Sequence, residues 1–178
     1  MKACRSARAI ETAIHLHGEI ARKGLLTADI IVGNALVDMF AKCGCLHEAQ
    51  EGFDRLHGKN LVSWNAIIGG YAEQKEGACY ALRLFEKMID QVDPDKVTFL
   101  YILKACGSLD ARDQGYWIHD RVVTDGLESE SFIQAALIDM YMKLGCFKAA
   151  QRVFGSVFDP TLCLCNAIIT GYAQHKHG

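Results

Sequence analysis

The sequence lacks any long apolar run and any excess of positive charge. No apolar stretch in its 178 residues approaches the roughly 20 that a helix needs to cross a bilayer, so no membrane partner is expected. Nineteen lysines and arginines stand against 21 aspartates and glutamates, which gives a formal charge of −2 and a pI near 6.4. This balance argues against a protein whose binding rests on phosphate neutralisation alone.

The sequence also gives no sign of a disulfide framework, although it contains eight cysteines. Such frameworks belong to small secreted chains, whereas these cysteines sit inside apolar helical patterns such as Leu103-Lys104-Ala105-Cys106. We therefore expect buried, reduced thiols that pack as small hydrophobic groups.

What the sequence does contain is an internal repeat. The stretch Ser63–Tyr71 recurs in variant form, and the related stretches are 32–40, 98–106, 133–141 and 164–172. The equivalent positions in these stretches are Asn34, Asn65, Leu100, Ala135 and Asn166. Successive positions are 31, 35, 35 and 31 residues apart. Steps of this size indicate a repeat array.

Each repeat divides into two amphipathic helices, and no strand is predicted. The apolar spacing predicts helices over 7–23, 33–43, 46–55, 63–73, 78–89, 98–106 and 111–124. Glycines are expected to stop helices or form turns at Gly24, Gly44, Gly126 and Gly145. Pro94 ends one repeat, Asp95 is a candidate N-cap for the next helix, and Asp110 for the helix that begins at residue 111.

The repeats resemble pentatricopeptide repeats, and specifically the plant subgroup that alternates long, short and standard units. The motifs that carry the resemblance cover essentially the whole chain, and they are Gly33–Gly44, Val62–Ala72, Ala81–Met88, Leu103–Cys106, Ile118-His119 and Ala136–Tyr141 with Gly145. The resemblance implies an all-α fold, an α-solenoid of antiparallel helical hairpins stacked into a right-handed superhelix.

On this resemblance the chain divides into six segments. They are a partial long repeat 1–29, a short repeat 30–60, a standard repeat 61–95, a long repeat 96–130, a short repeat 131–161 and a partial standard repeat 162–178. Both ends fall inside a repeat, which predicts a fragment of a longer array. Lys2-Ala3-Cys4 recurs as Lys104-Ala105-Cys106, so the first segment belongs to the array and no transit peptide is expected in this chain.

The resemblance implies sequence-specific binding of single-stranded RNA, one base per repeat, in a mitochondrion or chloroplast. Side chains on the first helices would meet splayed bases. The alternation of units resembles proteins that guide C-to-U RNA editing, in which a separate C-terminal domain is linked to the chemistry. The expected partners are single-stranded RNA and other RNA-editing factors, without DNA. No cofactor and no enzymatic activity are expected.

In the family, the fifth and the last residue of a repeat choose the base. Carried over to this sequence, Asn34 with Asn60 resembles a pyrimidine reader that leans towards cytosine, and Asn65 with Asp95 resembles a uracil reader. An acceptor-only carboxylate would hold the Asn65 amide in one orientation. Asn166 stands at the same position of the last segment, and its partner position lies beyond Gly178.

Ile31 and Val62 stand at the second position of their repeats, where the family packs an apolar side chain on the base. Two repeats depart from the code, because their fifth and last residues are Leu100 with Glu130 and Ala135 with Thr161. With two complete readers we expect weak RNA binding by this chain alone. We expect Asn34 and Asn65 to lie side by side and to face outward.

Several of these residues have a purely structural interpretation. Asn34, Asn65 and Asn166 would then cap or bridge neighbouring helices. Core packing is expected for Trp64, Tyr71, Phe85 and the methionines. Phosphate contact and a solvated helix end are equally compatible with Lys42, Lys104 and Lys143.

No metal site or catalytic pair is expected. His17-Gly18-Glu19 imitates part of a zinc-deaminase motif, but the Pro-Cys-x-x-Cys that would complete it is missing. Cys43-Gly44-Cys45 and Cys163-Leu164-Cys165 have the wrong spacing for common zinc sites. The alternative function is a helical scaffold for protein–protein interaction without RNA readout.

Overall fold

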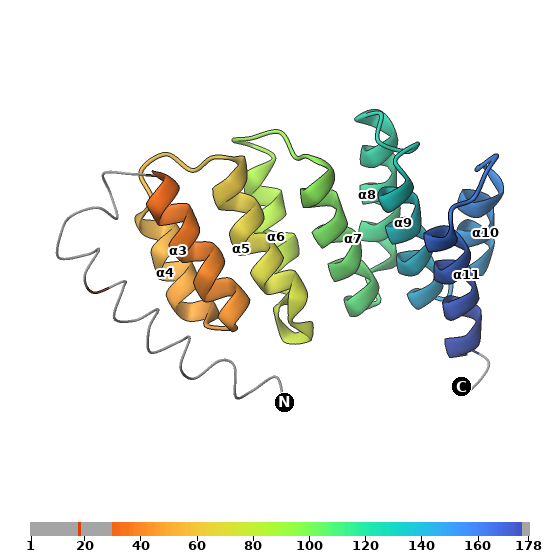
Figure 1. Cartoon of the computed structure of the whole chain (residues 1–178), viewed down its shortest axis with the longest axis horizontal. Helices are drawn as coiled ribbons and strands as arrows, with labels where there is room; N and C mark the ends of the chain where they lie inside the picture. Colours follow the sequence, from red (N-terminus) through yellow and green to blue (C-terminus); the bar gives the residue numbers. More distant parts are fainter. Residues whose placement is uncertain (1–17, 19–29, 176–178) are drawn as a thin grey trace. The chain divides into compact units, whose positions relative to one another are not determined.

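The computed structural model describes residue 18 and residues 30–175. The helix predicted over 7–23, Gly24 and the partial repeat 1–29 therefore lie outside the described residues, apart from Gly18. The chain forms two compact units, 1–93 and 94–178. Figure 1 shows the helices of both units in sequence order.

The described residues 30–93 of the first unit form two helical hairpins. α3 (Ile30–Cys43) pairs with α4 (Leu46–Arg55), and α5 (Leu61–Glu73) pairs with α6 (Ala78–Met88) after a short 3₁₀ turn, Lys75–Gly77. The first helices of the two hairpins, α3 and α5, also pack against each other. The unit is therefore a stack in which each hairpin buries its apolar face on its neighbour.

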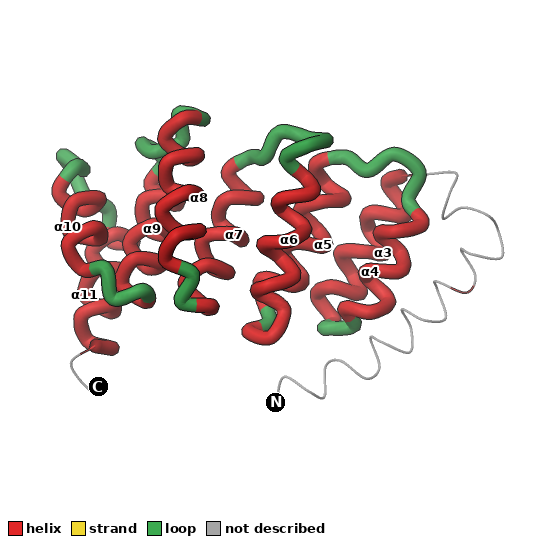
Figure 2. The backbone as a smooth tube through the Cα atoms, turned by 180° about the vertical axis from the view of Figure 1, so that it is seen from behind, coloured by secondary structure: helices red, strands yellow, loops and turns green. Residues whose placement is uncertain are grey.

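The second unit repeats this arrangement and adds one further helix. Its helices are α7 (Lys96–Leu109), α8 (Arg112–Thr124), α9 (Ser131–Lys143), α10 (Phe147–Gly155) and α11 (Leu162–His175). α7 packs on α9 and α9 packs on α11, while α8 and α10 pair with the first helices that precede them. The tube in Figure 2 shows only helices and loops among the described residues.

The fold is thus an all-α solenoid of stacked helical hairpins, as predicted. No helix among the described residues is long and apolar enough to span a membrane. The hand of the superhelix stays a prediction.

The described glycines predicted to stop helices or form turns do so, whereas the cap predicted at Asp110 is wrong. Gly44 and Gly145 have φ of 81° and 68°, and Gly126 after α8 has φ of 71°, where a side chain would be strained. Asp110, predicted to N-cap α8, is instead the C-cap of α7 at φ 52°, and Ala111 is the N-cap of α8. The prediction was wrong because α7 continues to Leu109, so Asp110 adopts the left-handed conformation that ends a helix.

The core consists of apolar side chains from both helices of each hairpin. Trp64, Phe85 and Met88 are buried, as expected, and the Trp64 ring meets Phe53 edge-on at 4.8 Å between ring centres. Tyr71 is only half-buried and stacks on Tyr80 at 5.5 Å.

The expectation of buried cysteines is wrong for most of them. All seven described cysteines are free thiols, but Cys106 alone among them is buried, and Cys79 and Cys163 are exposed. Cys45 and Cys146 stand at the N-caps of α4 and α10, where the chain turns at the surface. Burial of Cys106, the one buried cysteine among the described residues, raises the pKa of its thiol to about 12.

Candidate nucleic-acid interface

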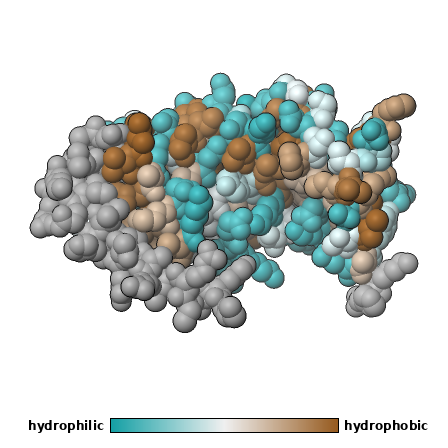
Figure 3. All heavy atoms as spheres, in the orientation of Figure 1, coloured by the Kyte–Doolittle hydropathy of each residue, from teal (hydrophilic) through white to brown (hydrophobic). Residues whose placement is uncertain are grey.

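A row of apolar side chains stands exposed at the second residue of the first helices. In the first unit Ile31 is 75% exposed and Val62 is 60% exposed, at the beginnings of α3 and α5. Figure 3 shows hydrophobic groups on the surface over these helices. The next two residues of the helix, Ser63 and Trp64, are buried, so the helix is packed at this point. Val62 is exposed because it lies on the outer face of the packed helix.

The second unit carries two residues at the same position that were not predicted as stacking groups. Val97 on α7 and Phe132 on α9 are exposed, Phe132 to 70%. The repeat period could have identified both residues, because successive steps of 35 residues lead from Val62 to Val97 and from Val97 to Phe132. Phe132 is the only aromatic residue at these four positions, and aromatic faces are the usual platform for an unpaired base.

A hydrogen-bonded cluster lies beside this row in the first unit. Asn60 N-caps α5 in a capping box: its Oδ1 accepts from the Ser63 N–H at 3.0 Å, and its own N–H donates to Ser63 Oγ at 3.2 Å. Asn34 on α3 completes the cluster, because its Nδ2 donates to Asn60 Oδ1 at 3.2 Å and its Oδ1 accepts from Ser63 Oγ at 2.6 Å. The fifth and the last residue of the short repeat are therefore in direct contact.

The predicted outward orientation is wrong for Asn34, whose side chain and backbone together are only 7% exposed. The Ser63 hydroxyl, at the third residue of α5, draws the amide into the packing between the two hairpins. Asn34 thus bridges neighbouring hairpins, as the structural interpretation expected. The bridge uses one of the two amide hydrogens and one of the two oxygen lone pairs, so half of the bonding capacity remains.

Asn65 and Asp95 fall in different units. Asn65 is half-buried on α5. Asp95 N-caps α7, where its Oδ1 accepts from the Thr98 N–H at 2.9 Å in a capping box like that of Asn60. The sequence predicted this cap correctly, whereas the joint role of Asn65 and Asp95 in base selection stays a prediction. Asn166 is exposed on α11.

The fifth residues of the other two complete repeats are apolar. Leu100 is half-buried on α7 and Ala135 is buried on α9. Glu130 is the N-cap of α9 without a side-chain capping bond, and Thr161 precedes α11. These positions supply no amide at the fifth residue of their repeats.

Two of the three lysines proposed as phosphate contacts pair with carboxylates of their own helices. Lys42 Nζ lies 2.6 Å from Asp38 Oδ2, and Lys143 Nζ lies 2.6 Å from Asp139 Oδ2. Both pairs are exposed, so solvent screens them and a phosphate can compete for the ammonium group.

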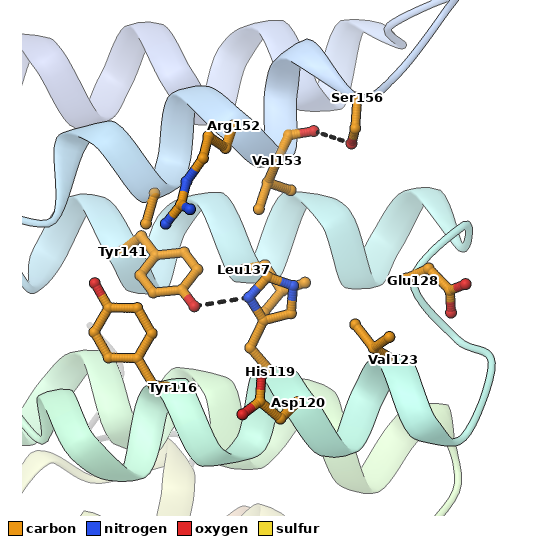
Figure 4. A pocket seen from close by; sticks show the side chains of 11 residues that line it. Tyr116, His119, Asp120, Val123, Glu128, Leu137, Tyr141, Arg152, Val153 and Ser156 are labelled. Carbon is orange, nitrogen blue, oxygen red and sulfur yellow. Dashed lines mark hydrogen bonds between the residues drawn. The ribbon is translucent and has the colours of Figure 1, made fainter.

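A pocket of about 410 Å³ opens in the second unit between α8, α9 and α10. Figure 4 shows the His119 ring and the Tyr141 hydroxyl meeting in its wall, with Tyr116 and Arg152 beside them. Burial lowers the pKa of His119 and raises that of Tyr141, so both groups are neutral at physiological pH.

No group of three or more potential metal ligands gathers anywhere in residues 30–175. The thiols of Cys43, Cys45, Cys163 and Cys165 are free. His17, part of the deaminase-like motif, lies outside the described residues.

Comparison with known proteins settles the family. The model of the PPR repeat matches residues 34–61, which begin at Asn34 and include the whole of α4. The chain is 39% identical over 183 residues to the Arabidopsis thaliana pentatricopeptide repeat-containing protein At1g08070, chloroplastic, covering 98% of this chain and 24% of that protein. The chain belongs to the pentatricopeptide repeat family.

Other pentatricopeptide repeat proteins show the same likeness. The mitochondrial At3g09040 of Arabidopsis thaliana is 36% identical over 177 residues, covering 99% of this chain and 17% of that protein. The crystal structure of the maize pentatricopeptide repeat protein PPR10 superposes with a TM-score of 0.71 at 20% identity, over 90% of this chain and 24% of PPR10. PPR10 has also been solved in complex with an 18-nt psaJ RNA element. The chain spans about a fifth to a quarter of the length of the first curated relatives that it matches.

Proposed function

We propose that this chain is a single-stranded RNA-binding segment of an organellar RNA-processing protein. The observation that carries the proposal is an exposed apolar residue at the second residue of successive first helices, Ile31 and Val62 in the first unit and Val97 and Phe132 in the second. Burial of apolar surface is the main driving force of folding, and four such side chains left exposed at one repeat position indicate a ligand with flat apolar faces. Unpaired bases have such faces.

Base selection is the finer part of the proposal. Asn34 with Asn60 favours cytosine among the pyrimidines, and Asn65 with Asp95 favours uracil. The contact between Asn34 and Asn60 supports a joint role for the first pair. The complex of PPR10 with RNA supports RNA as the ligand class.

The setting of the whole protein is inferred from its relatives. Curated relatives are named chloroplastic or mitochondrial, which supports an organellar location. The alternation of 31- and 35-residue steps supports the subgroup that guides C-to-U editing, in which this segment would select the site and take no part in the chemistry.

The proposal is tested by comparing two exposed phenylalanines. Phe132 is the exposed apolar residue at the second position of α9, while Phe158 lies in the loop before α11 and is fully exposed. Loss of a stacked base costs about 1–3 kcal/mol, so Phe132→Ala should weaken binding of single-stranded RNA at least about fivefold, and Phe158→Ala should leave it unchanged. Fluorescence anisotropy with labelled RNA measures both. Equal affinities of the two variants, or no RNA binding by the unmodified chain, would favour the protein-interaction alternative.

A further inference from the structure

The polarity of the Asn34 side-chain amide is fixed by two backbone N–H groups. A backbone N–H can only donate, so the side-chain atom of Asn60 that faces the Ser63 N–H at 3.0 Å must be its oxygen. That oxygen can only accept, so the Asn34 atom facing it at 3.2 Å must be the NH₂ group. The orientation of Asn34 therefore follows from the capping box of the next helix.

The Ser63 hydroxyl holds the other end of the Asn34 amide, its oxygen. Its oxygen accepts from the Asn60 N–H at 3.2 Å, which leaves its single hydrogen to be donated. Two acceptors lie within reach of that hydrogen, Asn34 Oδ1 at 2.6 Å and Asn60 Oδ1 at 3.0 Å, and the bond to Asn34 is the shorter. Ser63 is fully buried, so no water competes for it. A flip of the Asn34 amide would place its oxygen against Asn60 Oδ1 and would lose the bond from Ser63.

We propose that Ser63 is a positioning residue for base selection by Asn34, because its hydroxyl fixes which end of the amide meets the base. This inference rests on the proposed RNA-binding function and names a residue outside the pair that the resemblance assigns. Cytosine and uracil share the O2 acceptor and differ at N3, which accepts in cytosine and donates in uracil. An amide held in one orientation distinguishes the two, whereas an amide free to flip can bond to either.

The experiment measures the affinity of the full chain for short uridine-rich RNAs that carry one cytosine at each position in turn. Asn34→Ala identifies the position at which Asn34 discriminates. At that position Ser63→Ala should reduce the cytosine-to-uracil affinity ratio about fivefold, the value of one hydrogen bond. Ser63→Thr keeps a hydroxyl and should retain the ratio, since Thr98 forms the same capping box with Asp95.

Thr124→Ala is the matched control, because the Thr124 hydroxyl donates only within its own helix, to the Asp120 carbonyl oxygen at 2.9 Å. Thermal melts show that the variants are folded. If Ser63→Ala does not fold at the working temperature, Ser63→Cys replaces it, since a thiol is a weak donor of similar size and should also lower the ratio.

The outcomes separate the two claims. If Asn34→Ala abolishes discrimination and Ser63→Ala leaves it unchanged, the role of Ser63 is overturned and base selection by Asn34 stands. If Asn34→Ala leaves discrimination unchanged at every position, base selection by Asn34 fails and the role of Ser63 falls with it. A loss in Ser63→Ala that Ser63→Thr does not share confirms the inference.

Discussion

His119 and Tyr141 join two successive hairpins of the second unit through a hydrogen bond between His119 Nδ1 and the Tyr141 hydroxyl oxygen, 2.7 Å apart. His119 belongs to α8 and Tyr141 to α9, and the two rings also meet edge-on at 5.5 Å between centres. The bond lies in the wall of the pocket in Figure 4. It couples a half-buried titratable group to the packing of a repeat on its neighbour.

This pairing predicts a loss of stability on acidification. Burial lowers the pKa of His119 below its ordinary value of 6.5, and Arg152 also lowers it, while Asp120 opposes the shift. The unfolded chain therefore binds more protons than the folded chain just below pH 6.5, so this contribution to stability is present above that pH and is lost as the pH falls through the folded pKa. Thermal melts between about pH 7.5 and pH 5 should show a falling midpoint.

His119→Gln is the control for this prediction, because glutamine can bond to the Tyr141 hydroxyl and does not titrate. Its melting midpoint should fall less over the same pH range. A slope equal to that of the unmodified chain would assign the effect to other groups.

Gly70 marks a close approach of α5 to α3. A Cβ atom at Gly70 would lie 2.6 Å from Ala41 Cβ and 3.2 Å from Ala41 Cα. Gly70→Ala should therefore lower the free energy of unfolding by about 1–3 kcal/mol, the usual cost of overpacking.

The matched control is Gly155→Ala at the last residue of α10, where a Cβ meets nothing within 4 Å. This change should be neutral or stabilising, since alanine favours the helix. Urea unfolding of the two variants gives both values, and similar effects of both changes would contradict the packing described for α3 and α5.

The cysteines should differ strongly in reactivity. The buried Cys106 thiol, with its pKa raised to about 12, should react slowly with a maleimide near neutral pH, while the exposed Cys79 and Cys163 should react fast. Mass spectrometry of peptides from timed samples measures each rate. In denaturant the three should react alike, and a Cys106 that reacts as fast as Cys79 in the folded chain would contradict its burial.

The sequence predicted helices well because each repeat shows the same apolar spacing several times. α4 begins and ends at the predicted residues, and Gly44 and Gly145 stand in turns as expected. Helix ends were less accurate, since α7 extends three residues beyond its predicted end and thereby converts Asp110 from an N-cap into a C-cap. Ends depend on local capping, which a periodic pattern does not contain.

The sequence assigned the candidate site residues, whose role in base selection stays a prediction, but it did not predict the orientation of Asn34. The repeat period identifies Asn34, Asn60, Ile31 and Val62 as equivalent to family positions. The Asn34 side chain is held by two polar partners of the following hairpin, Asn60 Oδ1 and Ser63 Oγ, and apolar spacing carries no information about such contacts. Phe132 was overlooked because its repeat departs from the code at Ala135, although stacking and hydrogen-bond readout use separate positions.

The central claim is that the fifth residue of a repeat selects a base, and the direct test is the base preference of Asn65→Thr. By the family resemblance this change should shift the preferred base at one RNA position from uracil towards guanine, with the other positions unchanged. Affinities are measured for a set of RNAs that vary at that position, with Asn65→Thr compared with the unmodified chain. A switch at one position is the predicted result, and an equal loss of affinity for every RNA would contradict the account.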